Sequence, residues 1–176
     1  MNLRLTKRGD YTVRAALALA RAYPTSDYKK IRDVAAEMDL PLKYTPQILS
    51  LLAKADLAEA RAGRNGGYRL RKDPAEISLL AVVEAAEGPL RTERCTLSGG
   101  PCRWEEMCAV HPAWEKATEA FRESLANVNL AQVLAVDVGL EAGDYTVPES
   151  AHRRSIATGR SPAKRSRAAK RSKRTY

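Results

Sequence analysis

Apolar residues recur every three or four positions along most of the chain, which predicts a mainly helical protein. The predicted helices span residues 9–23, 30–38, 46–55, 77–86, 111–127 and 129–136. Asp10 is the predicted N-cap of the first helix, because a short carboxylate side chain accepts from free backbone N–H groups there. Thr45 is the predicted cap of the third helix, and Pro46 then takes its first helical position.

The second and third helices are separated only by a tight turn at 39–42, which is the arrangement of a helix-turn-helix. Residues 57–61 and 68–71 follow as two short strands around the turn dipeptide Asn65-Gly66, which predicts a β-hairpin. This hairpin region is rich in basic residues, namely Arg61, Arg64, Arg69, Arg71 and Lys72. An ordinary solvated turn is the alternative reading of the hairpin alone. Its position directly after two such helices indicates a winged helix-turn-helix, so the predicted fold class is mainly α with a small β-hairpin wing.

The start of the third helix is the candidate DNA-reading surface, since the N-terminal end of a recognition helix meets base edges and phosphates. Gln47 has an amide that can bond adenine through two hydrogen bonds. Lys43 and Tyr44 are predicted phosphate contacts, and Thr45 lies beside them. Arg61 and Arg64 of the wing are predicted to enter the neighbouring minor groove. The predicted partner is therefore double-stranded DNA.

The helix predicted over 111–127 carries a long apolar stripe at three- and four-residue spacing, formed by Trp114, Ala117, Phe121 and Leu125. Such a stripe is either part of a core or a dimer seam. We favour a seam, because DNA-reading helix-turn-helix proteins pair their half-site contacts by two-fold symmetry. The sequence therefore predicts a homodimer with a long dimerisation helix.

The three cysteines of the chain, Cys95, Cys102 and Cys108, lie within 14 residues, and His111 follows. Thiolates are soft ligands, and an iron–sulfur cluster or a zinc ion takes about four donors. An odd number of cysteines in a short segment also argues against a disulfide framework. We therefore predict a metal centre in this cysteine segment (residues 90–110). A structural zinc site of three cysteines and a histidine, or three free thiols, are the alternatives.

The net charge of +9 is concentrated in the last 26 residues. Residues 151–176 hold ten of the 30 basic residues and no acidic one, so residues 1–150 carry 20 basic against 21 acidic residues. A basic tail with few large apolar groups cannot bury a core, so we expect disorder there. It would either bind the phosphate backbone without sequence preference or act as a solubilising extension.

The composition also excludes several classes of protein. There is no run of about 18 apolar residues and no secretory leader pattern, so we expect a cytoplasmic protein without a membrane partner. There is no nucleophile–base set, no phosphate-cradling glycine loop and no paired catalytic carboxylates. We therefore predict no enzyme activity and no small-molecule substrate. An electron carrier would leave the helix-turn-helix and the wing without a role.

Four stretches of the sequence together resemble the IscR/NsrR family of bacterial winged-helix dimers. They are, in order, Leu5-Thr-Lys-Arg-Gly-Asp-Tyr-Thr-Val-Arg-Ala, Tyr44-Thr-Pro-Gln-Ile-Leu, Gly63-Arg-Asn-Gly-Gly-Tyr-Arg-Leu and the cysteine segment. The resemblance covers about residues 1–140. It implies a dimer joined by paired long helices, with a [2Fe–2S] or [4Fe–4S] cluster on the three cysteines. It also implies operator binding, commonly repression, that responds to nitric oxide, redox state or cluster supply.

The fourth cluster donor differs among the members of this family, and the sequence leaves two candidates open. A histidine donor, typical of IscR-like proteins, matches His111 and favours a [2Fe–2S] centre. An aspartate from the other subunit, typical of NsrR-like proteins, matches Asp10 and favours a [4Fe–4S] centre. The chain departs from the family pattern at three places. Six residues rather than five separate Cys95 from Cys102, and Pro46 stands where a glutamate often reads bases. Ala62 stands where the family has an arginine before the hairpin glycine, which leaves Arg61 and Arg64 as the minor-groove residues.

These predictions divide the chain into three parts. Residues 1–75 form a winged helix-turn-helix DNA-binding domain. Residues 76–140 form the cluster-binding segment and the dimerisation helices. Residues 141–176 form a disordered basic tail.

Overall fold

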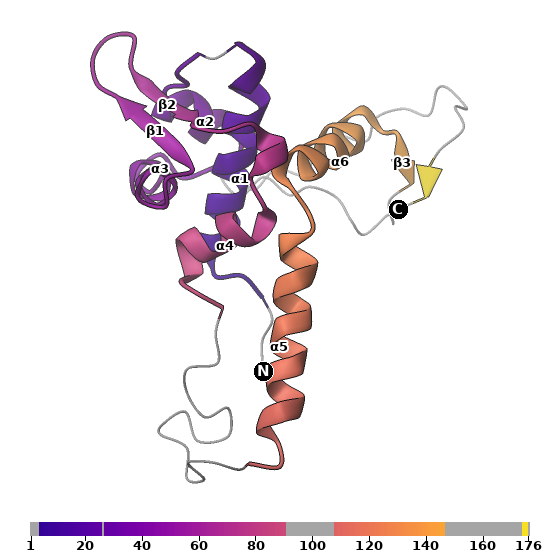
Figure 1. Ribbon diagram of the computed structural model, residues 1–176. Helices are drawn as coiled ribbons and strands as arrows, with labels where there is room; N and C mark the ends of the chain where they lie inside the picture. Colours follow the sequence, from indigo (N-terminus) through magenta and orange to yellow (C-terminus); the bar gives the residue numbers. More distant parts are fainter. Residues whose placement is uncertain (1–3, 26, 91–107, 147–173, 176) are drawn as a thin grey trace.

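The computed structural model describes residues 4–25, 27–90, 108–146 and 174–175 (Figure 1). Its elements, in chain order, are α1 (Lys7–Ala22), η1 (Tyr23–Thr25), α2 (Ile31–Glu37), α3 (Thr45–Lys54), β1 (Ala58–Arg61), β2 (Gly67–Leu70), η2 (Pro74–Glu76), α4 (Leu79–Glu87), α5 (His111–Ala126), α6 (Leu130–Ala142), β3 (Tyr145–Thr146) and β4 (Arg174–Thr175). The predicted fold class, mainly helical with a two-stranded wing, is confirmed. Elements α1 to α4 and the hairpin form one body, and α5 extends away from it as an arm (Figure 1).

The first helix begins two residues earlier than its sequence predicts, and its cap is a different residue. Thr6 is the N-cap, and its hydroxyl oxygen accepts a hydrogen bond from the Gly9 N–H at 3.1 Å. The Thr6 hydroxyl in turn donates to Glu87 Oε1 at 2.7 Å, which ties the start of α1 to the end of α4. The prediction that Asp10 caps the helix is wrong. Asp10 lies inside the first turn, where its carboxylate pairs with Arg14 at 2.9 Å.

The turn of the helix-turn-helix is closed by backbone hydrogen bonds, and these decide where α3 starts. The N–H groups of Tyr44 and Thr45 donate to the Pro41 carbonyl at 2.9 and 3.2 Å. Tyr44 is the N-cap, so the prediction of Thr45 as the cap is wrong. Thr45 is the first helical residue and fully buried, and its hydroxyl also donates to the Pro41 carbonyl, at 3.1 Å. Pro46 is the second residue of α3, one position later than predicted, and still lies in its first turn.

The hydrophobic core lies between α1, α2, α3 and α4, where the inward faces of the amphipathic helices meet. Its largest fully buried apolar side chains are Leu19, Met38, Leu49, Leu52, Ile77 and Leu130. Leu130 comes from the start of α6, whose backbone N–H donates to the Ile77 carbonyl at 2.8 Å. The core therefore also holds the junction between the body and the α5–α6 segment.

Two leucines that flank the start of α3 provide a matched test of this core. Leu49 is 0% exposed and Leu42 is 58% exposed. Leu49→Ala should lower the free energy of unfolding by about 2–5 kcal/mol, because it removes buried methyl groups and leaves a cavity. Leu42→Ala should change it by no more than about 0.5 kcal/mol. Urea unfolding followed by circular dichroism measures both values, and equal losses would contradict the described burial.

The wing is a two-stranded antiparallel hairpin that pairs Ala58 with Leu70 and Arg61 with Gly67. A backbone bridge adds Lys29 to its outer edge, through reciprocal N–H···O bonds of 2.9 Å with Tyr68. A side chain on Gly67 would bring its Cβ within 2.3 Å of the Lys29 carbonyl oxygen, so glycine is needed for this approach. The bridge fixes the hairpin to the segment that leads into α2.

The last helix is longer than predicted. It starts with a capping box formed by Asn129 and Gln132 and runs to Ala142 instead of ending at Val136. Gly143, in the left-handed conformation at φ +79°, ends it. The chain then forms β3, which pairs in parallel with β4, so these two short strands fall within the stretch predicted as tail. Within the described ranges, no helix is long and apolar enough to cross a membrane.

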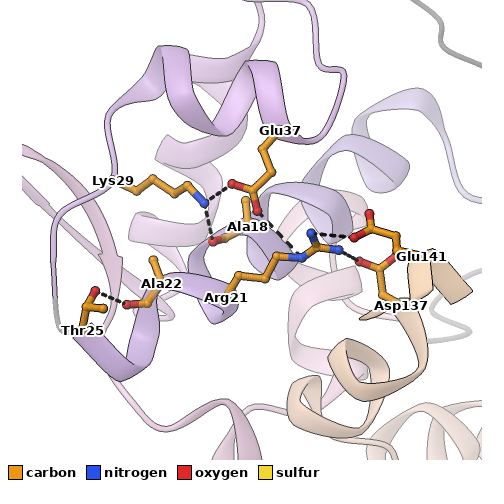
Figure 2. A network of polar contacts seen from close by, with 8 residues as sticks. All are labelled: Ala18, Arg21, Ala22, Thr25, Lys29, Glu37, Asp137 and Glu141. Carbon is orange, nitrogen blue, oxygen red and sulfur yellow. Dashed lines mark hydrogen bonds and ion pairs between the residues drawn. The ribbon is translucent and has the colours of Figure 1, made fainter. Parts of the chain in front are cut away.

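Arg21 of α1 explains why α6 continues past the predicted end, since two acidic residues beyond Val136 bind it (Figure 2). Its guanidinium pairs with Asp137 and, at 3.0 Å, with Glu141. These carboxylates, Glu141 foremost, raise the pKa of Arg21 above its ordinary value. The Arg21 Nε also lies 3.8 Å from Glu37 of α2, which in turn binds Lys29. One cation therefore links α1 to both the helix-turn-helix and α6.

Candidate functional site

The N-terminal end of α3 presents an exposed polar surface. Lys43 and Gln47 are exposed, and Tyr44 keeps 57% of its surface accessible. Thr45, predicted to contact DNA beside them, is buried, and it belongs to the packing of the turn rather than to this surface. Leu42 is exposed at the same end, and sequence periodicity gave no sign of it because it lies in the turn.

The electrostatics of this helix end favour an anion. The first N–H groups of a helix lack intrahelical acceptors, and the aligned peptide dipoles add partial positive charge there. The first turn of α3 contains no acidic residue that would neutralise this potential, and Lys43 adds a full positive charge before it. A phosphate group is therefore a favoured neighbour of this surface.

The wing lies beside this surface. Figure 1 shows α3 and the β1–β2 hairpin on the same side of the body, and β1 packs against α3. Arg61 and Arg64 are both exposed, at the end of β1 and in the hairpin turn. Arg71, in contrast, pairs with Asp56. The fold thus brings the exposed end of α3, with Lys43, together with the wing arginines, which begin about 18 residues later in the sequence, forming one candidate nucleic-acid interface.

A cluster at the stem of the wing was not anticipated from the sequence. Glu59 accepts hydrogen bonds from the Tyr28 hydroxyl at 2.7 Å and from Arg69 Nε at 2.5 Å. The guanidinium groups of Arg69 and Arg61 lie 4.8 and 5.7 Å from the centre of the Tyr28 ring. The hydrogen bond from Tyr28, followed by that from Arg69, holds the pKa of Glu59 below its ordinary value. The alternation of side chains along the two strands could have indicated that these charged residues share one face of the hairpin. No local sequence pattern places Tyr28 beside that face.

The candidate metal donors are divided between the arm and the body. Cys108 is a half-buried free thiol just before α5, and its carbonyl accepts from the His111 N–H at 3.3 Å. His111 is half exposed, with Nε2 4.0 Å from Glu115 Oε2. Cys95 and Cys102 lie outside the described residues. Across the part of the chain that is described, no three His, Cys, Asp or Glu side chains converge as a metal site.

The donors that are described fit a thiolate-bound metal centre in their chemistry. A thiol and an imidazole on adjacent turns are soft and borderline ligands that iron–sulfur clusters and zinc both accept. Asp10 lies in the first turn of α1, in the body, whereas α5 begins at the far end of the arm (Figure 1). Within one chain, His111 therefore lies beside Cys108, whereas Asp10 belongs to the body.

The cysteine segment connects two elements that one arginine already holds together. Arg122 of α5 donates to Glu84 Oε1 and to the Leu90 carbonyl oxygen, both at 3.1 Å. The Leu90 N–H donates to the same Glu84 oxygen at 3.0 Å. The segment therefore starts at a residue bound to α5 and returns at Cys108, directly before α5.

Known proteins resemble this chain along most of its length. The family model Rrf2, described as an iron-dependent transcriptional regulator, matches residues 5–136. The HTH-type transcriptional regulator IscR of Serratia proteamaculans is 31% identical over 132 residues, which cover 75% of this chain and 79% of that protein. IscR of Vibrio cholerae is 29% identical over 142 residues, 81% of each chain.

Solved structures with the same fold include two regulators. CymR, the global cysteine regulator of B. subtilis, superposes with a TM-score of 0.63 at 23% identity, covering 77% of this chain and 98% of that one. IscR of T. potens gives a TM-score of 0.61 at 24% identity, covering 78% and 90%. At these identities the structural likeness shows the fold alone.

Proposed function

The chain belongs to the Rrf2 family of transcriptional regulators, and on that premise we propose that it is a homodimeric repressor whose operator binding is controlled by an iron–sulfur cluster. The family supports regulation through DNA. We propose the cluster, the dimer and repression in addition. The proposed signal is nitric oxide, redox state or cluster supply, and the proposed role includes no catalysis.

The observation that carries the DNA-binding role is the shared surface of α3 and the wing. Gln47, Lys43 and Tyr44 are exposed at the positive end of α3, and Arg61 and Arg64 are exposed on the hairpin beside it. In a winged helix-turn-helix, such a helix end enters the major groove, and basic wing residues suit the narrower minor groove. Residues 1–75 are the proposed DNA-binding domain.

The surface of α5 supports the proposed dimer. None of the 16 residues of α5 is buried, although its stripe includes Trp114, Phe121 and Leu125. Phe121, one residue of this stripe, keeps 40% of its surface exposed. An apolar stripe of this length lowers the free energy of the protein if a second α5 covers it, at about 25 cal/mol per Å² of apolar surface. Residues 76–140 are thus the proposed cluster-binding and dimerisation segment, followed by the basic tail.

Cys95, Cys102 and Cys108 are the proposed cluster ligands, with His111 or the partner's Asp10 as the fourth donor. A bound [2Fe–2S] or [4Fe–4S] cluster would supply a centre that reacts with nitric oxide or oxidants and can be lost. Ligation by these side chains would restrict the joint held by Arg122 and Glu84, at which α5 meets the body. The position of the two DNA-binding domains in a dimer depends on that joint.

The second candidate is a zinc-stabilised or thiol-based winged-helix regulator without a cluster. It is favoured by the free thiol of Cys108, which suits a Cys3His zinc site or reversible oxidation equally well. Both candidates keep the same DNA-binding surface, so the metal content of the protein distinguishes them.

Gln47→Ala tests the DNA-binding surface. It should weaken binding to the operator by about 1–3 kcal/mol, because it removes a bidentate contact to a base, while binding to random DNA stays nearly unchanged. Fluorescence anisotropy with an operator selected from random duplexes and with a scrambled duplex measures both. Lys54→Ala, at the exposed opposite end of α3, is the control and should keep operator affinity. Equal affinity of the Gln47 variant and the wild type for the operator would refute the proposal that Gln47 of α3 contacts DNA bases.

A further inference from the structure

We propose that only one of two arginines on the same face of the wing, Arg61, supplies charge to DNA, because Glu59 keeps the other, Arg69, as an internal ion pair. This inference rests on the proposed DNA binding and states which of these two strand arginines takes part in it. Arg61 and Arg69 cannot be distinguished from the sequence alone, since both are basic residues on strands of one hairpin. The contacts around them differ.

The strand register places the three charged residues on one face. Glu59 and Arg61 are two positions apart in β1, so their side chains project to the same side of the hairpin. Arg69 of β2 lies directly opposite Glu59 in the ladder. Directly opposed side chains of opposite charge are a favourable cross-strand pair, and Arg61 has Gly67 opposite it, which offers no side chain.

Glu59 is bound by two neighbours through one carboxylate oxygen. The same carboxylate oxygen, Oε1, accepts from Arg69 Nε at 2.5 Å and from the Tyr28 hydroxyl at 2.7 Å. These bonds depress the pKa of Glu59 and raise the pKa of Tyr28, whose proton is held by that carboxylate. A lowered glutamate pKa means that the ion pair is fully formed above the ordinary pKa of about 4.3 and is lost only as the pH falls below it. The pair is therefore intact at neutral pH.

Tyr28 contacts the side chains of Glu59, Arg61 and Arg69 but does not neutralise the charge of Arg61. Its hydroxyl is held by Glu59, and the backbone of the next residue, Lys29, is bridged to Tyr68. The Arg61 guanidinium lies over the Tyr28 ring at 5.7 Å, an attraction that leaves its N–H donors available. In the described part of the chain, Arg61 makes no ion pair and its side chain is exposed. Arg61 thus remains a net cation on a rigid support.

The consequence for DNA binding is a wing with a smaller effective charge than its sequence suggests. Each cation that neutralises a phosphate releases counterions and adds about 0.9 to the salt slope, defined as the magnitude of the decrease of log K per unit of log salt concentration. Binding without sequence preference grows with each such contact. By keeping Arg69 paired, Glu59 limits nonspecific DNA binding. Of the two strand arginines, only Arg61 then contacts DNA phosphate.

The test is the salt dependence of binding to a 30-base-pair duplex of scrambled sequence, measured on the full chain between about 50 and 200 mM KCl. Arg61→Gln should lower the slope by about 0.9 per bound chain. Glu59→Gln should raise it by about 0.9, since Arg69 then loses the carboxylate that neutralises its charge. The double variant Glu59→Gln with Arg69→Gln should return the slope to that of the wild type. Arg61→Lys keeps the charge and should keep the slope.

The outcomes separate this inference from the proposed function. A double variant whose slope falls as far as that of Arg61→Gln would overturn the inference, because Arg69 would then contact phosphate in the wild type. An unchanged slope in Arg61→Gln would overturn it as well. A wild-type chain that binds neither scrambled nor selected duplexes would overturn the proposed function together with this inference. Circular dichroism confirms that each variant is folded before its slope is compared.

Discussion

Replacement of Cys108 by alanine is expected to abolish the visible absorbance, iron and acid-labile sulfide of the anaerobically purified protein. A cluster takes about four protein donors, and the variant leaves two cysteines. The wild type should absorb near or above roughly 400 nm, as cysteine-ligated clusters do. Operator affinity should change about 5- to 150-fold between the wild-type and variant proteins, the usual range for a coupling of about 1–3 kcal/mol. Visible spectra, metal analysis and anisotropy measure these changes.

Variants of the neighbouring residues serve as controls and decide the fourth donor. Val110→Ala changes an exposed residue of the same turn and should keep the colour and the iron. If His111 completes the site, His111→Ala should change the spectrum and Asp10→Ala should not, with about two irons per chain. The reverse, with about four irons, indicates Asp10 of the partner subunit. Zinc without colour would establish the zinc-stabilised alternative. Identical DNA binding by cluster-loaded and cluster-free protein would refute sensing.

Phe121→Asp is expected to convert the dimer into a monomer and to weaken operator binding about 100-fold or more. The substitution places a charge in the centre of the apolar stripe of α5, where a second α5 would have to bury it without a partner. Losing the dimer also removes the linkage between two half-site contacts, and such linkage is worth about 10²–10⁴ in affinity. Sedimentation velocity and anisotropy with the full operator measure the two effects.

Lys116→Asp is the matched control for Phe121→Asp. Lys116 is exposed on the same helix, about 140° around its axis from Phe121, and it also becomes an aspartate. It should leave the sedimentation coefficient unchanged. A Phe121→Asp protein that still sediments as a dimer would place the dimer contact elsewhere than on α5, and a monomeric wild type would refute the homodimer.

The individual helices and the hairpin could be predicted because their signals are local. Helical spacing of apolar residues, the Asn65-Gly66 turn and Pro46 in the first turn of α3 each act within a few residues. Errors arose where a local rule had competitors. Asp10 and Thr45 are both suitable caps by residue type, yet Thr6 and Tyr44 occupy those positions. Thr6 is held at the cap position by a hydrogen bond to Glu87, which lies 81 residues away.

Residue types at short spacing suffice to predict the winged helix-turn-helix, the family, the basic character of the wing and the clustering of the cysteines. Which residues of those segments remain accessible depends on the tertiary structure. It buried Thr45, extended α6 through the pairing of Arg21 with Asp137, 116 residues apart, and set His111 at the far end of the arm from the first turn of α1. It also paired Arg69 with Glu59 and left Arg61 exposed. Such outcomes depend on which elements pack against each other, and hydrogen bonds and ion pairs between distant segments are not encoded in any local pattern.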